Sequence, residues 1–247
     1  MENKYEELRE FLKSSEWVKR DELKTPKDKD IKRPLPVKEY DETNLISLPN
    51  HKNLSLSNDS IKDLVKNRKS RRKYNNESLT LKELSFLLWT TQGVRDDHIR
   101  LRTVPSGGAV HPFETYLYLN RVEGIKPGLY RYIPGEHALV FIKISKDSKR
   151  EIIKAANKQK FVGEAAVVFM WTVIPKRGEW KYGILAHKLA AIDVGHLCQN
   201  LYLATEAINA GMCAVDAYDQ KTADSFLEVD GKEEFVIYMA PVGKYDE

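Results

Sequence analysis

The chain has 247 residues, of which 42% are hydrophobic and 31% charged, as in an ordinary soluble globular protein. Its first seven residues are too charged for a secretory signal, and the longest apolar run, residues 165–174, is about half the ~20 residues that a membrane span needs. Cys198 and Cys213 imply neither a disulfide framework nor a metal site, and this usage favours the cytoplasm.

The net charge of +4 has a local origin. Residues 1–73 hold 19 Lys and Arg against 14 Asp and Glu, a balance of +5, whereas residues 74–247 hold 21 against 22, a balance of −1. Five basic residues stand together between Arg68 and Lys73. Nucleic-acid binding normally requires a wider basic surface, often with interleaved aromatic residues, so we expect no nucleic-acid partner.

Residues 1–57 are predicted to form an N-terminal extension. The spacing of Leu8, Phe11 and Leu12 indicates a short amphipathic helix over residues 6–17. Dense charge and four prolines then favour an extended path. Such a segment either packs along the main domain or is partly disordered, and we favour packing.

Residues 58–247 are predicted to form the main domain. Helices are expected over residues 60–67, 80–93 and 146–157, the second one beginning with a capping box of Thr80 and Glu83. Strands are expected over residues 115–119, 129–133, 139–144, 165–174, 212–218 and 235–242. A long helix over residues 180–209, followed by Gly211, is expected to be the central column of a core or dimer. Helices and strands mix without βαβ regularity, which predicts an α+β fold.

Two short segments carry candidate binding chemistry. In residues 68–72, Arg-Lys-Ser-Arg-Arg, the cations and the hydroxyl can surround a phosphate, because guanidinium groups supply forked donors. The alternative is a solvated basic helix end. In residues 105–108, Pro-Ser-Gly-Gly, a stiff turn with little side-chain bulk lets backbone amides approach a flat or anionic ligand. The alternative is a connecting turn with no ligand.

These segments together carry a family resemblance. R-x-S-x-R before an L-x-x-L-L-W-x-x-Q-G helix, followed by P-S-G-G-A-x-H-P-x-E-x-Y, resembles the FMN-dependent nitroreductase superfamily. Within it, the chain is similar to the SagB/ThcOx-type branch, which includes the azoline dehydrogenases of thiazole and oxazole peptide biosynthesis. Four later motifs match in the correct order: G-L-Y-R-Y at 128–132, G-H-L-C-Q-N-L at 195–201, A-V-D-A-Y at 214–218 and P-V-G at 241–243.

The resemblance implies a nitroreductase-like fold, with a mixed, mainly antiparallel sheet flanked by helices and a long central helix. It also implies an intertwined homodimer that binds one FMN at each subunit boundary. The residues it assigns to the FMN phosphate and ribityl end are Arg68, Lys69, Ser70 and Arg72, with Lys244 as a further phosphate contact. The residues it assigns to the flavin ring are Pro105, Ser106 and Gly107 of the neighbouring subunit, and Asp216 and Ala217, whose backbone N–H meets N5.

The azoline dehydrogenase branch also has a Lys-Tyr pair ahead of its long helix, which makes Lys181 and Tyr182 the catalytic candidates. Oxidation of an azoline removes a proton from carbon while hydride passes to flavin N5, so a base beside the flavin is required. Lys181 would be that base, with Tyr182 relaying or donating a proton. From the residues alone, the alternative is an ordinary helix start with Lys181 solvated and Tyr182 packed.

The expected function is therefore an FMN-dependent oxidoreductase that transfers hydride through N5 and acts on a small molecule or a modified peptide. Ala109 and His111 stand where other nitroreductases carry Asn and Gln, and Ala109 cannot make that side-chain contact to the ring. One alternative is an NAD(P)H-dependent nitro or quinone reductase, with NAD(P)H as a transient donor. The other is a non-catalytic flavin-binding protein. No metal site is expected.

Overall fold

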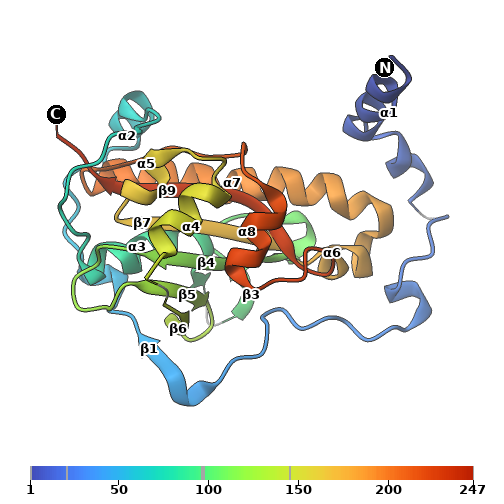
Figure 1. The fold of residues 1–247 in the computed structure, drawn as a ribbon. Coiled ribbons are helices and arrows are strands. Elements are labelled where there is room, and N and C mark those ends of the chain that lie inside the picture. Colours follow the sequence, from blue (N-terminus) through green and yellow to red (C-terminus); the bar gives the residue numbers. More distant parts are fainter. Residues whose placement is uncertain (1, 21, 96–97, 145, 247) are drawn as a thin grey trace.

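The computed structural model describes residues 2–20, 22–95, 98–144 and 146–246. The predicted extension and main domain also include residues 1, 21, 96–97, 145 and 247, which lie outside the described residues. Figure 1 shows a central sheet covered by helices, with the N-terminal segment running around the outside of this body. Among the described residues, no helix is both long and apolar enough to cross a membrane.

The described helices are α1 (Glu2–Leu12), α2 (Ile61–Asn67), α3 (Leu81–Gln92), α4 (Ser148–Ala155), α5 (Lys160–Glu164), α6 (Pro175–Tyr182), α7 (Ala186–Ala207) and α8 (Gln220–Leu227). The strands are β1 (Leu45–Ser47), β2 (Val94–Arg95), β3 (His98–Arg102), β4 (Phe113–Leu119), β5 (Gly128–Ile133), β6 (Ala138–Lys143), β7 (Val167–Val173), β8 (Ala210–Met212) and β9 (Phe235–Lys244).

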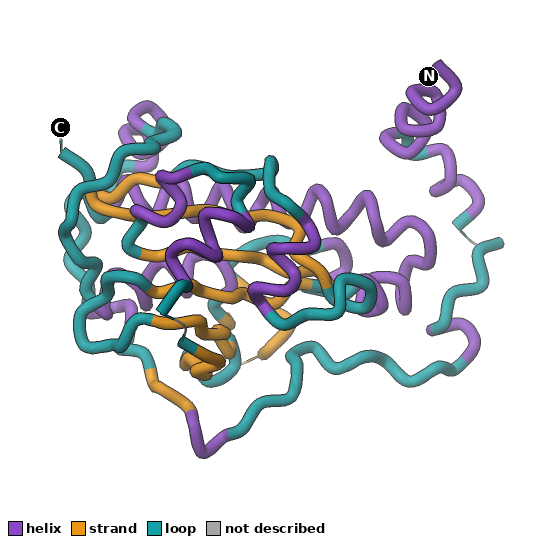
Figure 2. The backbone as a smooth tube through the Cα atoms, viewed as in Figure 1, coloured by secondary structure: helices purple, strands orange, loops and turns teal. Residues whose placement is uncertain are grey.

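The main sheet has the strand order β1-β6-β5-β4-β7-β9-β8, and every pairing between its strands is antiparallel. Strands β2 and β3 form a separate pair. Figure 2 shows that the helical layers lie on both sides of this sheet. The predicted α+β fold, with its long helix and mainly antiparallel sheet, is confirmed.

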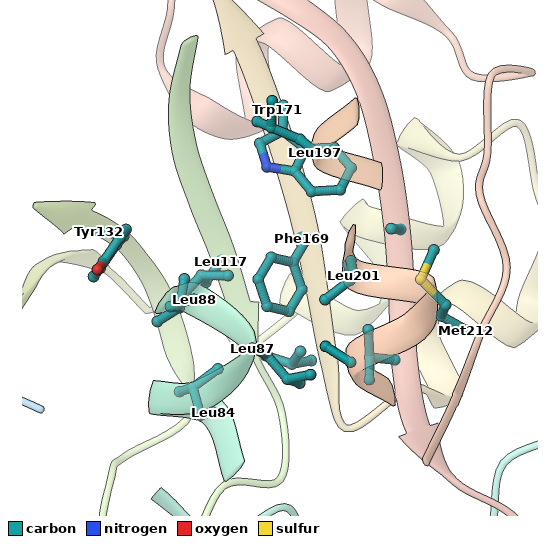
Figure 3. Close-up of a cluster of buried hydrophobic side chains, with 14 of the residues drawn as sticks. Leu84, Leu87, Leu88, Leu117, Tyr132, Phe169, Trp171, Leu197, Leu201 and Met212 are labelled. Atoms are coloured by element: carbon teal, nitrogen blue, oxygen red, sulfur yellow. The ribbon is translucent and has the colours of Figure 1, made fainter. Parts of the chain in front are cut away.

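The core follows the pleat of the two central strands, β4 and β7, because successive residues of a strand point to opposite faces. On one face, Leu117 and Phe169 contact helices α3 and α7, which contribute Leu84, Leu88 and Leu201 to the same cluster (Figure 3). On the other face, alternate residues such as Tyr118 and Met170 pack with α4, α5 and α8. Both faces of the central strands are therefore buried, and α7 is fixed along its length.

Several predicted boundaries were wrong for local reasons. The expected helix over residues 180–209 is divided, because Gly183 has φ 54° and ends α6 before α7 begins. The expected strand over residues 212–218 ends at Met212, after which Val215 alone bridges Met239. The helix expected over 146–157 is the shorter α4, and α5 and α8 were not predicted.

The N-terminal helix is also displaced from its predicted position. It forms α1 instead of spanning residues 6–17, and a 3₁₀ helix, η1 (Ser15–Lys19), follows it. Figure 1 shows α1 standing away from the sheet. The later part of the extension contacts the body: β1 pairs with β6, and the guanidinium of Arg131 donates to the carbonyl of Glu39 at 2.6 Å.

Candidate functional site

The basic segment, residues 68–72, is held by its backbone against β8. Ser70 forms a parallel bridge with Met212, and the Arg71 amide donates to the Met212 carbonyl at 2.9 Å. The side chains of Lys69, Ser70 and Arg72 are exposed, while that of Arg68 is half-buried. A fixed backbone with outward cations is the arrangement that an anionic ligand requires.

Tyr202 of α7 connects this basic segment to the loop after β8. Its hydroxyl lies 2.8 Å from the Ser70 hydroxyl and accepts a hydrogen bond from the Ala214 amide at 2.9 Å. The Arg68 guanidinium carbon lies 5.1 Å from the centre of the Tyr202 ring, within cation–π range. Asp216 and Ala217 are exposed and follow Ala214 after a single residue, Val215. The structure therefore brings Arg68 and Ser70 close to the loop that carries these two candidates.

Arg71 is not aimed outward like its neighbours. It forms a buried ion pair with Glu206 of α7, in which the second guanidinium nitrogen lies 3.2 Å from the second carboxylate oxygen. A Cβ placed at Gly211 would lie 2.5 Å from the Arg71 side chain, so the close approach of Arg71 requires glycine there. The ion pair anchors the basic segment at one register.

Lys244 is engaged with the protein itself. Its amine donates to the Glu83 carboxylate and to the Ile208 carbonyl, both at 2.6 Å. It lines a polar cavity of about 470 Å³ that also exposes the carboxylates of Glu77 and Glu83. The structure does not orient the Lys244 amine toward Arg68 or Ser70, as the resemblance implied for a phosphate contact.

The glycine turn, residues 105–109, is organised by Asp193 of α7. The Ser106 hydroxyl donates to the Asp193 carboxylate at 2.6 Å, and the Gly107 amide donates to it at 3.0 Å. Gly108 and Ala109 have φ values of 57° and 53°, which bend the chain sharply. Burial raises the pKa of Asp193, and the hydrogen bonds from Ser106 and Gly107 oppose this rise. Pro105 is exposed at the start of the turn.

Lys181 and Tyr182, at the end of α6, pack directly on this turn. The Lys181 amine donates to the Gly108 carbonyl at 3.0 Å. A Cβ built on Gly108 would lie 2.1 Å from the Tyr182 hydroxyl and 2.3 Å from the Lys181 amine. Only a glycine leaves room for both side chains over the turn. From the other side, Trp17 of η1 covers Tyr182, with 5.9 Å between the ring centres.

The candidate residues thus form two groups at different levels of α7. The glycine turn, on which Lys181 and Tyr182 pack, meets the helix at Asp193, whereas the basic segment meets it at Tyr202 and Glu206. At 1.5 Å per residue, these levels are about 14 to 20 Å apart along the helix. One chain therefore holds two groups of candidate residues that do not touch.

Three residues that organise these two groups were missed by the sequence analysis: Asp193, Tyr202 and Glu206. Asp193 and Glu206 are charged and buried in α7, and the helical spacing of their apolar neighbours places them on the inner face. Charged side chains are rarely buried without a partner. A carboxylate on that face therefore indicated a buried partner. The partners lie far away in sequence, at 87 residues for Ser106 and Asp193 and 135 residues for Arg71 and Glu206.

The donor set of the basic segment fits the phosphate of FMN. Two guanidinium groups, an amine and a hydroxyl stand on a fixed backbone. Among the described residues, ion pairs within 4 Å engage Arg71 but not Arg68, Lys69 or Arg72. The glycine turn adds little side-chain bulk of its own at Gly107 and Gly108, although Leu189 lies beside Gly107 and Lys181 and Tyr182 lie over Gly108.

Comparison with known proteins gives the family. The Nitroreductase family profile matches residues 65–244. The chain belongs to the nitroreductase family. A nitroreductase-family protein of Methanocaldococcus jannaschii, MJ1384, is 33% identical over 184 residues, which cover 74% of this chain and 90% of that protein.

Two further matches extend the comparison. The trifolitoxin-processing protein TfxB of Rhizobium leguminosarum bv. trifolii is 28% identical over 141 residues, 54% of this chain and 37% of TfxB. A solved nitroreductase-family structure from Ralstonia eutropha JMP134 superposes with a TM-score of 0.69 at 24% identity, over 87% of this chain and 97% of that one. The second match supports the fold that the sequence predicted.

Proposed function

We propose that this protein is an FMN-dependent oxidoreductase whose site is completed by a second copy of the chain. The observation that carries the proposal is the packing of Lys181 and Tyr182 on the glycine turn, with the amine 3.0 Å from the Gly108 carbonyl. This contact joins the proposed base to the turn that would lie against the flavin. Membership of the nitroreductase family supports oxidoreductase chemistry.

In this proposal the two groups of candidate residues are half-sites, and their separation along α7 supports a two-copy site. The α7 surface between them offers room for a partner helix, because a Cβ added at Gly195 would meet nothing within 4 Å and Ile192 is 47% exposed. An antiparallel partner across this surface would bring the glycine turn of one copy toward the basic segment of the other. Each site would then take Arg68, Ser70 and Arg72 from one copy.

Bound FMN supplies a hydride acceptor at N5. The protein's own contribution is to place donors and a base around the reacting carbon. Lys181 in its neutral form would take the proton from that carbon, and the adjacent Tyr182 hydroxyl would relay it or donate one back. The Gly108 carbonyl orients the Lys181 amine, and Asp193 keeps the turn in position. Because general bases contribute about 10²–10⁴-fold, loss of Lys181 is expected to reduce turnover by that range.

For the substrate, we propose an azoline ring in a modified peptide. The SagB-like motifs and the similarity to a trifolitoxin-processing protein favour this class. Ala109, which offers no side-chain contact to the ring, points the same way. The second candidate, reduction of nitro or quinone compounds by NAD(P)H, is favoured by the family and by the name of the Methanocaldococcus relative.

One anaerobic experiment separates the two candidates. The purified protein, loaded with FMN, is mixed with NADH or NADPH, and the flavin absorbance is followed. Rapid bleaching supports the reductase. Slow or absent bleaching supports the dehydrogenase when a separate aerobic assay, in which oxygen reoxidises the flavin, shows turnover of an azoline peptide. Lys181→Met and Tyr182→Phe should reduce azoline oxidation and still bind FMN. Unchanged oxidation by both variants would refute the assignment of the base.

The shared site has its own test by subunit mixing. An Arg68→Ala/Arg72→Ala copy lacks the phosphate half-site, and a Gly108→Val copy lacks the turn half-site. Each is expected to be inactive alone. Because a mixed dimer has one site with both intact halves, refolding the two copies together should restore part of the activity. Mixtures that stay inactive would argue that each site is built from one chain.

A further inference from the structure

Glu114 belongs to the H-P-x-E-x-Y motif, yet it lies in neither half-site. It is the second residue of β4, and its carboxylate accepts a hydrogen bond from the Arg177 guanidinium at 2.6 Å. The two side chains are only 2% and 4% exposed. The desolvation energy lost when a carboxylate and a guanidinium are buried offsets much of the energy of their attraction. The pair therefore calls for a role other than net stability.

The pair joins the two elements that carry the proposed base and the turn. Arg177 lies on α6, four residues and about one helical turn before Lys181. Glu114 follows the glycine turn by only a few residues at the start of β4. Close by, the Ile174 amide donates to the Pro112 carbonyl at 2.8 Å. Besides the contact between Lys181 and Gly108, the connection between this part of the chain and α6 therefore includes a charged clamp and a backbone bond.

We propose that the Glu114–Arg177 ion pair is a positioning device that sets where α6 delivers the Lys181 amine over the glycine turn. This inference rests on the proposed function, in which Lys181 is the base. A helix of eight residues is not stable by itself, so its orientation depends on tertiary contacts. Arg177 supplies such a contact with fixed geometry, because its guanidinium is a planar fork of donors.

The clamp is itself held by the N-terminal extension. The Arg177 Nε donates to the Leu35 carbonyl at 2.8 Å, and the Lys38 amide donates to the Glu114 carboxylate at 3.0 Å. Each member of the pair thus has a second partner from residues 35–38, which restricts rotation of both side chains. In this arrangement the extension contributes to the alignment of α6 without touching the reacting atoms.

The test compares two ion pairs on the same helix. Arg177→Met and Glu114→Gln break the buried ion pair. Arg177→Lys keeps the positive charge but removes the planar guanidinium group. The matched control is Glu233→Gln, which breaks the exposed ion pair between Glu233 and Lys176. Lys176 is the residue before Arg177 on α6. Because a misplacement of about 1 Å can cost 10²-fold, kcat is expected to fall about 100-fold in Arg177→Met with little change in KM. Arg177→Lys should recover part of that loss, and the control should keep wild-type kcat.

A second measurement reports on the lysine itself, in protein without substrate. The rate of Lys181 acylation by acetic anhydride is compared with that of exposed Lys13 in the same sample. In wild type, the contact with Gly108 slows the reaction, and in Glu114→Gln or Arg177→Met the relative rate is expected to rise several-fold. This arm remains informative if Arg177→Met does not fold, because Glu114→Gln preserves side-chain volume.

The outcomes separate the inference from the proposed function on which it rests. Wild-type kcat and wild-type Lys181 acylation in both clamp variants would overturn the positioning role, even where Lys181→Met is inactive. If Lys181→Met keeps full activity, the proposed base is wrong. The acylation rate still decides whether the clamp positions the side chain, with a rise supporting the inference and no change refuting it.

Discussion

Gly108→Ala perturbs the proposed site through a single methyl group. The new Cβ would lie 2.1 Å from the Tyr182 hydroxyl and 2.3 Å from the Lys181 amine, whereas ordinary contacts begin at 3.4 Å. The differences, 3.4 − 2.1 = 1.3 Å and 3.4 − 2.3 = 1.1 Å, are the least shifts that the two side-chain ends must make. A displacement of about 1 Å at a catalytic group can cost 10²-fold in rate. We expect turnover to fall by about that factor.

The stability cost of the same change is small and can be controlled. Gly108 has φ 57°, and an L-residue in this left-handed region costs roughly 1–2 kcal/mol. Gly124 has φ 76° and nothing within 4 Å of an added Cβ, so Gly124→Ala carries the backbone penalty without the contact. The assay is turnover of an azoline peptide or of NAD(P)H, with urea unfolding of both variants. Equal turnover in Gly108→Ala and Gly124→Ala would refute the reasoning.

Three further predictions concern the residues that hold the two half-sites. Burial raises the pKa of Asp193 above its unfolded value. The stability that this carboxyl contributes is therefore present below the unfolded pKa and is lost as pH rises through the folded pKa. In urea unfolding, the free energy of unfolding of Asp193→Asn should increase relative to that of wild type as pH increases from about 4. Glu206→Gln leaves Arg71 buried without its counter-charge and should lower the free energy of unfolding by about 3 kcal/mol, whereas Glu228→Gln in a more exposed pair should cost less than about 1 kcal/mol. Arg68→Ala or Arg72→Ala should weaken FMN binding about 10- to 100-fold in fluorescence titration, as expected for one charge-assisted bond of about 1.5–3 kcal/mol, and Lys143→Ala should leave it unchanged.

Local signals predicted most of the fold. Thr80 and Glu83 form the expected capping box, because both hydrogen bonds of that motif involve residues only three apart. Strand β7 appeared as an apolar run because both of its faces are buried. Strand β4 was predicted from alternation, although both of its faces are buried as well. The break at Gly183 also had a local signal, since glycine is the residue that ends a helix with positive φ. Apolar spacing on both sides of it concealed the break.

The helix α8 had a signal that the sequence analysis did not use. Asp219 caps this helix by accepting a hydrogen bond from the Thr222 amide at 2.9 Å, and the α8 residues Phe226 and Leu227 are buried. The prediction of a strand over residues 212–218, just before α8, followed the apolar residues after Gly211. A single bridge at Val215 shows why the pattern was misleading: the segment runs beside β9 without continuous pairing.

The site could be predicted only in part, because its geometry depends on contacts between distant residues. The motifs named Ser106 and Lys181, but neither motif indicates that Asp193 accepts from Ser106 or that Lys181 reaches Gly108. These pairs are separated by 87 and 73 residues, so no local period relates them. The position of Lys244 illustrates the same limit, since its carboxylate partner Glu83 lies on another element.

A buried carboxylate holds each of the three segments that we propose to form or align the site. Glu206 fixes the basic segment through Arg71, and Asp193 fixes the glycine turn. Glu114 fixes α6 through Arg177. Apolar side chains of similar volume could provide equal or greater stability at such positions, because the desolvation of ions offsets their attraction. An apolar contact tolerates sliding, however, whereas a carboxylate that accepts from two directed donors does not. The recurrence of this device beside both half-sites is therefore better explained by orientation than by stability.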